Sequence, residues 1–140
     1  MILLDTKVIS EIMRARPDPT VRTWFRALPR REFWTASVVI AELFSGVDLM
    51  PAGRKQTELR GLVEAMIAED LRGQILAFDL SAARQYGQIL SYREEIGRPI
   101  KEMDALLAAT AKAHGATMAT RNIPDFEHCG IALVNPWQSA

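Results

Sequence analysis

Short apolar runs alternate with segments of helical periodicity along the whole chain, and this alternation limits the possible folds more than any other feature. We predict strands over residues 1–5, 32–36, 74–78 and 116–120, and a last apolar stretch covers residues 131–134. We predict helices over residues 6–15, 19–28, 54–72, 81–96 and 102–114, and a further helix that has Ser37 as its N-cap and runs through Val47. Strands that alternate with helices favour a parallel sheet covered on both faces. The predicted fold class is therefore α/β, a three-layer α/β/α architecture with a central parallel sheet.

The composition suits a single domain over residues 1–140, because 49% of the residues are hydrophobic and can build a core. The 17 basic and 17 acidic residues cancel, which excludes a protein that holds nucleic acid by a uniformly basic surface. Cys129 is the single cysteine and cannot form an internal disulfide. The sequence shows neither a targeting segment nor an apolar stretch long enough to span a membrane, so it predicts a cytoplasmic protein.

Three carboxylates stand where acidic residues are uncommon. Asp5 directly follows four apolar residues at the end of the first predicted strand, Glu42 lies inside an apolar helical run, and Asp104 begins an Ala-rich helix. Each has an ordinary explanation: Asp5 as a helix cap, Glu42 on a polar helix edge, and Asp104 as an acid favoured by the helix dipole. All three together are harder to explain separately, because ligands collect outside the carboxyl ends of parallel strands.

Such a cluster of carboxylates needs a cation to offset its mutual repulsion. Hard oxygen ligands select Mg²⁺ or Mn²⁺, whereas zinc is not indicated because His114 and His128 are isolated. A Mg²⁺ site built from carboxylates typically serves phosphoryl chemistry.

A fourth polar element follows the strand predicted at 116–120. It runs from Thr120 through Asn122 and Asp125, so its side chains can orient a water molecule or hold Asp5. The alternative is an ordinary turn, because Asn, Pro and Asp are common turn residues.

Taken in order, these motifs make the chain resemble a PIN-domain protein, and more narrowly the VapC-type toxins of the FitB-like branch. The resemblance covers essentially the whole chain. It rests on Leu3-Leu4-Asp5-Thr6, Ala41-Glu42-Leu43 with Gly46, the helix that begins near Asp104, Thr120-Arg121-Asn122-Ile123-Pro124-Asp125-Phe126, and the closing Asn135-Pro136-Trp137.

The resemblance implies a Mg²⁺-dependent endoribonuclease, with Mn²⁺ as a possible substitute, that a small VapB-type antitoxin holds inactive. It also implies a homodimer and a toxin–antitoxin hetero-oligomer that contacts operator DNA only through the antitoxin. The family roles fall on Asp5 and Asp104 as metal-binding carboxylates and on Glu42 as the third acid. The fourth acidic position of many PIN domains falls at Asn122, and Asp125 lies close by in sequence. The resemblance further implies that Thr6 and Thr120 supply hydroxyl groups to the site.

Lys7 is a second departure, because relatives usually have Asn two residues after the first Asp. A lysine there can pair with the acids, contact RNA phosphate or compete with the metal. Together with Asn122 it leaves open the alternative of a catalytically impaired PIN module that binds antitoxin or nucleic acid without cleavage. The same residue argues against an aspartyl-nucleophile phosphatase, which needs a second Asp at that position, and Thr6 with Lys7 argues against a receiver domain.

Two further segments are candidate interaction surfaces. Residues 14–31 contain six arginines against Asp18 alone, which suits phosphate contacts as well as a solvated helix face. The amphipathic helix over 54–72 is a candidate partner or dimer surface, unless its apolar stripe packs on the core.

Overall fold

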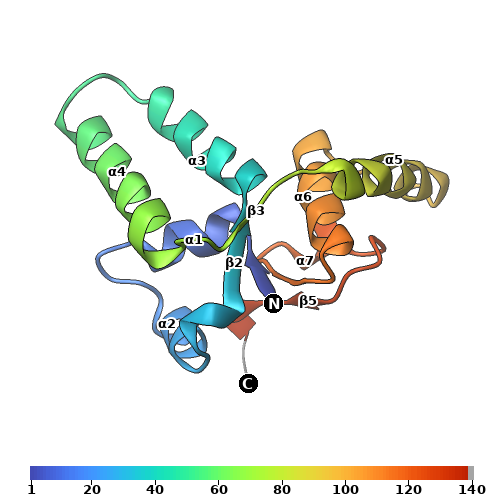
Figure 1. The fold of residues 1–140 in the computed structure, drawn as a ribbon, viewed down its shortest axis with the longest axis horizontal. Coiled ribbons are helices and arrows are strands. Elements are labelled where there is room, and N and C mark those ends of the chain that lie inside the picture. The colour runs from blue at the N-terminus through green and yellow to red at the C-terminus, as the bar shows by residue number, and fades with distance from the viewer. Residues whose placement is uncertain (139–140) are drawn as a thin grey trace.

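A parallel sheet forms the centre of the molecule. The computed structural model describes residues 1–138, and its strands have the order β3-β2-β1-β4-β5, with every neighbouring pair parallel (Figure 1). The strands are β1 (Ile2–Leu4), β2 (Phe33–Ala36), β3 (Ile75–Leu76), β4 (Thr117–Ala119) and β5 (Leu133–Val134). The predicted parallel sheet is confirmed. Strands β1 to β4 lie inside the ranges predicted for them, and β5 lies in the last apolar stretch, residues 131–134. Residues 139–140 of the predicted domain lie outside the described residues.

Helices cover both sides of this sheet, as the three-layer prediction requires. In Figure 1, α1, α2 and α4 lie on one side and α5 and α6 on the other, and α3 pairs with α4 in a hairpin that extends from the sheet. The helices are α1 (Thr6–Ile12), α2 (Pro19–Arg26), α3 (Ser37–Asp48), α4 (Arg54–Ala65), α5 (Leu80–Glu95), α6 (Glu102–Ala113) and α7 (Ile123–Phe126). No helix within residues 1–138 combines the length and the apolar character needed to cross a membrane.

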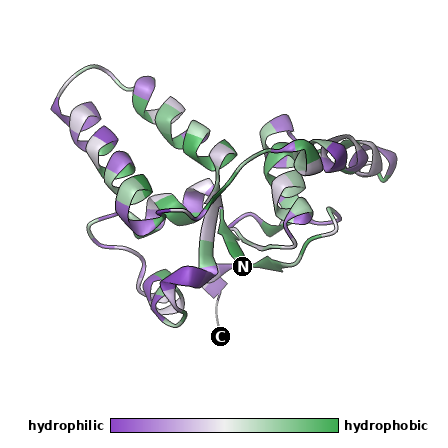
Figure 2. Cartoon of the chain, in the orientation of Figure 1, coloured by the Kyte–Doolittle hydropathy of each residue, from purple (hydrophilic) through white to green (hydrophobic). Residues whose placement is uncertain are grey.

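The core lies between the sheet and these helices. The most apolar segments are the strands and parts of α3 and α6, whereas α2 and α5 carry hydrophilic residues over much of their surface (Figure 2). On β1, Leu3 and Leu4 are fully buried because the strand has a neighbour on each side and helices over each face. Phe33 begins β2 and packs against the rings of Trp24 and Phe25 from α2.

Aspartate side chains cap three of the helices. Asp5 accepts a hydrogen bond from the Val8 amide at 3.0 Å, which caps α1, and Asp18 and Asp79 cap α2 and α5 in the same way. Each cap satisfies amide groups that have no partner inside the helix. The capping explanation for Asp5 is therefore correct as far as it goes.

The predicted N-cap at Ser37 is wrong. Ala36 occupies the cap position of α3 and Ser37 is the first helical residue. The Ser37 hydroxyl instead accepts a hydrogen bond from the Phe78 amide at 3.4 Å, across from the segment that follows β3. Local propensity places serine at a cap, but here a tertiary contact uses its oxygen.

Several predicted helices were longer than the helices in the structure. The helix expected over 54–72 is α-helical only to Ala65 and continues as a π-helical turn over Met66–Asp70 before Gly73, which adopts φ 72°. The helix expected over 6–15 ends at Ile12. The short helix α7 lies in the segment for which an ordinary turn was the alternative, and Pro124 falls in its first turn, where a missing amide costs nothing.

The packing of Phe33 provides a test of this core. Replacing Phe33 with alanine should lower the free energy of unfolding by about 3–5 kcal/mol, because it removes a fully buried ring and enlarges a small cavity that the ring already lines. Urea denaturation followed by circular dichroism measures the change. Leu80→Ala is the matched control, since Leu80 is 68% exposed, and its effect should stay within about 0.5 kcal/mol.

Candidate active site

The carboxyl ends of β1 and β4 bring together the acidic residues that the sequence singled out. Asp5 follows β1, Glu42 lies in the second turn of α3, and Asp104 lies in the first turn of α6. An open cleft of about 660 Å³ lies at this edge. Its lining consists of Lys7, Glu42, Lys101, Glu102, Met103, Asp104, Asn122 and Asp125.

Asp5 is the most deeply buried of the three acids, with 5% of its surface exposed. Burial raises the pKa of its carboxyl group, and the Thr120 hydroxyl, two backbone amides and the Lys7 charge partly offset the rise. One oxygen, Oδ1, receives the Val8 amide that caps α1. Capping and a functional role are therefore compatible in one side chain, because a carboxylate has two oxygens.

Glu42 and Asp104 are half-buried, and neither lies in the core. This degree of burial is still unusual for acidic side chains, as their apolar sequence surroundings indicated. Burial is the largest cause of the raised pKa of each. The charges of Asp104 and Asp5 raise the pKa of Glu42 further, and the charges of Asp125 and Asp5 act in the same sense on Asp104. The three acids therefore interact electrostatically across the cleft, as expected for one shared site.

Two threonine hydroxyls border these acids. Thr120 is fully buried beside Asp5 and accepts a hydrogen bond from the Asn122 amide at 3.0 Å. The Thr6 hydroxyl lies beside Glu42, where it partly offsets the rise in the Glu42 pKa, yet it is buried without a hydrogen bond at normal geometry within residues 1–138. A buried hydroxyl without a hydrogen-bond partner is uncommon, and it indicates a site that a polar ligand can complete.

Asn122 and Asp125 both reach the cleft. Asn122 precedes α7 and Asp125 lies within it, so the segment after β4 forms one wall of the site instead of a simple turn. Asp125 is exposed. After burial, its charge is the largest contribution to the raised pKa of Asp104. Lys7 lines the same cleft, where its charge lowers the pKa of Asp5.

The donor set at this edge suits a divalent cation, although the acids are not drawn together around one. Within residues 1–138, no three His, Cys, Asp or Glu side chains lie close enough to enclose a metal ion. The chemistry still fits, because the donors are carboxylate and hydroxyl oxygens, the acids repel one another, and the Thr6 hydroxyl has no partner. Asp5, Glu42 and Asp104 are the residues that would hold Mg²⁺ or Mn²⁺.

Sequence reasoning missed Arg93, which is buried in α5 and packs beneath α7. Its charge lowers the pKa of Asp104, so it belongs to the electrostatic surroundings of the cleft. One signal was available: Arg93 follows the buried Ile89 by four residues and so lies on the inward face of its helix. Lys101 and Met103 also line the cleft and were not singled out.

Two surface hollows continue from the cleft along α1. An apolar groove of about 540 Å³ between α1, α3 and α4 shares Glu42 with the cleft, and Leu62 and Val63 from the predicted amphipathic helix form part of its wall. A second hollow of about 500 Å³ shares Arg14 with this groove and is also lined by Arg22, Arg26 and Arg30.

The arginines of this second hollow differ in their partners. Arg14 pairs with Glu11 at 3.4 Å and Arg30 with Asp70 at 2.9 Å. Arg22 and Arg26 lie one turn apart on the exposed side of α2, and neither forms an ion pair within the described part of the chain.

Known proteins share both this sequence and this fold. A family model described as the PIN domain matches residues 2–128. The chain is 39% identical over 140 residues to the VapC ribonuclease Y4jK of Sinorhizobium fredii, and the match covers 100% of each. It is 40% identical over 137 residues to the toxin FitB of Neisseria gonorrhoeae, covering 98% of this chain and 99% of the relative.

A solved structure extends the similarity to the arrangement of the elements. The crystal structure of FitAcB from Neisseria gonorrhoeae matches with a TM-score of 0.91 and 40% identity, covering 99% of this chain and 100% of the other. The resemblance drawn from the ordered acidic motifs is thus confirmed by whole-chain sequence and structure comparisons. The chain belongs to the PIN domain family, in the branch that contains the VapC ribonuclease Y4jK and the FitB toxin.

Proposed function

We propose that this protein is a cytoplasmic, Mg²⁺-dependent endoribonuclease, the toxin of a type II toxin–antitoxin module whose cognate VapB-type antitoxin inhibits it. One observation carries the proposal. Asp5, Glu42 and Asp104 come from three different parts of the chain to one edge of a parallel sheet, where the charges of Asp5 and Asp104 raise the pKa of Glu42 and the charge of Asp5 raises the pKa of Asp104. Relatives in this branch bear the names VapC ribonuclease and toxin FitB, which supports the same activity here.

The acids would serve RNA hydrolysis by holding the cation. A bound divalent cation supplies charge neutralisation at the scissile phosphate and lowers the pKa of water, so that a nucleophile forms near neutral pH. Asp5, Glu42 and Asp104 would hold this ion, and the Thr6 hydroxyl beside Glu42 would be available to contact the bound group. On the opposite wall, Asn122 and Asp125 present oxygen acceptors that can orient the attacking water.

The partners follow from the same surfaces. A basic antitoxin side chain complements the acidic cleft, and the apolar groove between α1, α3 and α4 begins at Glu42 and can receive the rest of the inhibitor. The structure of FitAB, which shares 38% identity with this chain, was solved bound to a DNA fragment. By analogy we expect a homodimer that joins a toxin–antitoxin hetero-oligomer and reaches operator DNA only through the antitoxin.

One observation favours the alternative of a PIN module that binds without cleaving. Lys7 and Lys101 line the cleft, and their charges lower the pKa of Asp5 and Asp104 respectively. Two internal cations can thus replace part of the neutralisation that a metal would supply. Calorimetry with Mn²⁺ separates the two functions, because an inert module should bind no ion at millimolar concentration.

The carboxylate at position 104 provides the sharpest test of the mechanism. Asp104→Asn should reduce RNA cleavage about 100-fold or more, because several kcal/mol of transition-state stabilisation depend on the held cation. The metal-free variant should melt no lower than the wild type at neutral pH, since the substitution removes a carboxylate that its neighbours repel. RNA gel assays with Mg²⁺, with and without EDTA, and thermal melts measure both effects.

Glu64→Gln is the control for Asp104→Asn, because Glu64 is an exposed acid on α4 away from the cleft. Cleavage by Asp104→Asn at the wild-type rate, or wild-type cleavage that persists in EDTA, would contradict the proposed mechanism.

The raised pKa values predict that metal binding depends on pH. Protons compete with the ion for Asp5, Glu42 and Asp104, so Mn²⁺ affinity should fall as the pH is lowered from neutral to acidic values, and the fall should begin above the range where ordinary carboxylates titrate. Stability of the metal-free protein should change in the opposite sense. An acid whose pKa is raised by folding loses its stabilising contribution as the pH rises through that value, so acidification restores it.

Titration calorimetry and thermal melts across this pH range measure the two trends. Asp104→Asn should show a weaker pH dependence of stability than the wild type. A metal-free wild type whose melting temperature rises steadily from acidic to neutral pH would indicate that these acids are not destabilised by burial.

The unpaired arginines of α2 are the proposed contacts for RNA phosphates outside the cleft. The double variant Arg22→Gln/Arg26→Gln should raise KM for a long RNA and lower the slope of log affinity against log salt by about 1–2, because each phosphate contact releases counterions. The value of kcat and the cleavage of a dinucleotide should not change. Fluorescence anisotropy at several salt concentrations measures the slope, with Arg54→Gln/Arg60→Gln on α4 as the control, and equal slopes for the two double variants would exclude this contact.

A further inference from the structure

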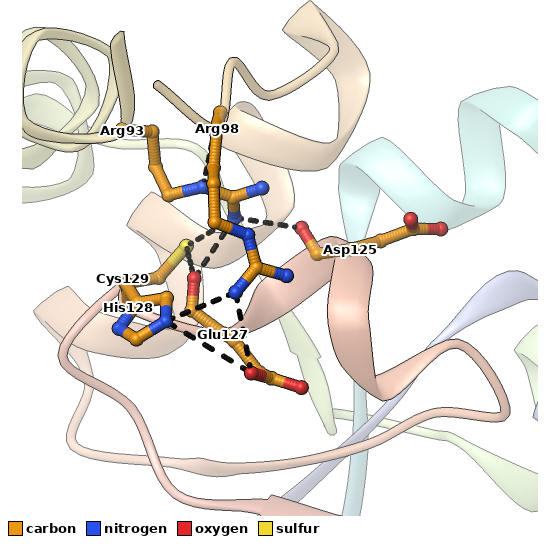
Figure 3. A network of polar contacts seen from close by, with 6 residues as sticks. All are labelled: Arg93, Arg98, Asp125, Glu127, His128 and Cys129. Carbon is orange, nitrogen blue, oxygen red and sulfur yellow. Dashed lines mark hydrogen bonds and ion pairs between the residues drawn. The ribbon is translucent and has the colours of Figure 1, made fainter. Parts of the chain in front are cut away.

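Arg93 is a buried cation whose hydrogen bonds all go to main-chain or sulfur atoms. It is 3% exposed, and its guanidinium donates to the carbonyl oxygens of Arg98 at 2.6 Å, Asp125 at 3.0 Å and Glu127 at 2.9 Å (Figure 3). Within residues 1–138 it forms no ion pair with a carboxylate. Burying a charge without an ionic partner costs free energy, so the burial of Arg93 calls for a structural or functional explanation.

These hydrogen bonds join the end of α5 to the segment that contains α7. Arg93 donates a hydrogen bond to the main-chain carbonyl of Asp125, and the Asp125 carboxylate extends away from the guanidinium (Figure 3). That carboxylate lines the active-site cleft and raises the pKa of Asp104. Arg93 therefore fixes the backbone from which the Asp125 side chain reaches the site, without neutralising it by direct contact.

Local sequence preferences do little to hold this segment in place. The helix α7 has four residues and no side-chain cap, and it is followed by His128 with φ 63°, a conformation that residues other than glycine rarely adopt. Cys129 lies at 3.6 Å from Arg93, and Arg98 contacts His128 at 3.1 Å. The contacts with Arg93 and Arg98, more than helix propensity, determine the position of residues 122–129.

The charge of Arg93 works in a second way. It lowers the pKa of Asp104 and so partly offsets the repulsion among the acids. Taken alone, a fixed cation behind the site would weaken the binding of a metal ion. The two roles thus predict opposite results when Arg93 is replaced. Loss of its charge alone would tighten metal binding, whereas loss of the Asp125 position would weaken it.

We propose that Arg93 is a positioning residue for the active site, which holds the carbonyls of Asp125 and Glu127 so that the Asp125 carboxylate faces Asp104. The inference rests on the proposed metal-dependent function of the cleft. It assigns to a buried side chain of α5 the task of completing a site whose acids come from β1, α3 and α6.

The test compares Arg93→Met and Arg93→Lys with the wild type. In Arg93→Met, the Kd for Mn²⁺ measured by calorimetry without RNA should rise about tenfold or more, the size typical of lost supporting contacts around metal ligands. Arg93→Lys keeps the charge and some donors, so it should give a smaller rise. In RNA cleavage, kcat should fall while KM stays within about twofold, because the arginine does not touch substrate.

Hydrogen exchange in the metal-free protein gives a readout that does not depend on activity. Amides of residues 122–129 should exchange about tenfold faster in Arg93→Met, with those of β1 unchanged. Arg84→Met removes the same charge from an exposed position on α5 and should change neither exchange nor Mn²⁺ affinity. A Mn²⁺ affinity that stays equal or becomes tighter in a folded Arg93→Met would overturn the proposal.

A further variant tests the proposal without altering Arg93. Asp125→Asn removes the carboxylate charge and leaves the carbonyl that Arg93 binds, so it should weaken Mn²⁺ binding, and its effect should not add to that of Arg93→Lys. Unchanged Mn²⁺ binding by Asp125→Asn would overturn the positioning role even if Arg93→Met fails to fold. A wild type that binds no Mn²⁺ would instead overturn the proposed function of the cleft, and this inference with it.

Discussion

Repulsion among half-buried and buried carboxylates is the constraint on which the rest of this structure depends. Asp5, Glu42 and Asp104 are held at one sheet edge, where burial raises the pKa of each and the charge of Asp5 raises the pKa of Glu42 and Asp104 further. Nothing in these side chains favours that arrangement, so the scaffold must impose it. The scaffold does so through rigid elements: the end of the central strand for Asp5, the second turn of α3 for Glu42 and the first turn of α6 for Asp104.

Asp5 shows how the fold and the site depend on the same atoms. Its main chain continues β1, with the Asp5 amide bonded to the Ala119 carbonyl, and its side chain caps α1. The cap restrains the rotamer of the Asp5 side chain, whose carboxylate lies beside the Thr120 hydroxyl. Because one oxygen satisfies helix amides, the other can serve a ligand, so structural and functional explanations of this residue are not alternatives.

The sequence allowed the parallel sheet, the layers and the three principal acids to be predicted, because these features have local signatures. Apolar runs of strand length, helical periodicity and acids inside apolar runs can be recognised within a few residues. The serine at 37 and the π-helical turn after Ala65 were not predictable in this way, since contacts with distant segments decide them. The role of Arg93 was missed for the same reason: its helical spacing from Ile89 indicates burial, but two of its carbonyl partners lie more than 30 residues away, and main-chain acceptors do not show in the sequence.

The net charge of zero acquires a different meaning once the charges are placed. Acids gather at the carboxyl edge of the sheet, whereas Arg22 and Arg26 line a separate hollow on α2, and the groove along α1 shares lining residues with both that hollow and the acidic cleft. A polyanion would be repelled by the cleft itself until a cation occupied it, and attracted by the arginines without that cation. Under the proposed function, the two charged regions would meet two separate requirements. The arginines would hold the phosphate chain without a metal, whereas the acidic cleft would accept one phosphate for reaction only with a bound cation.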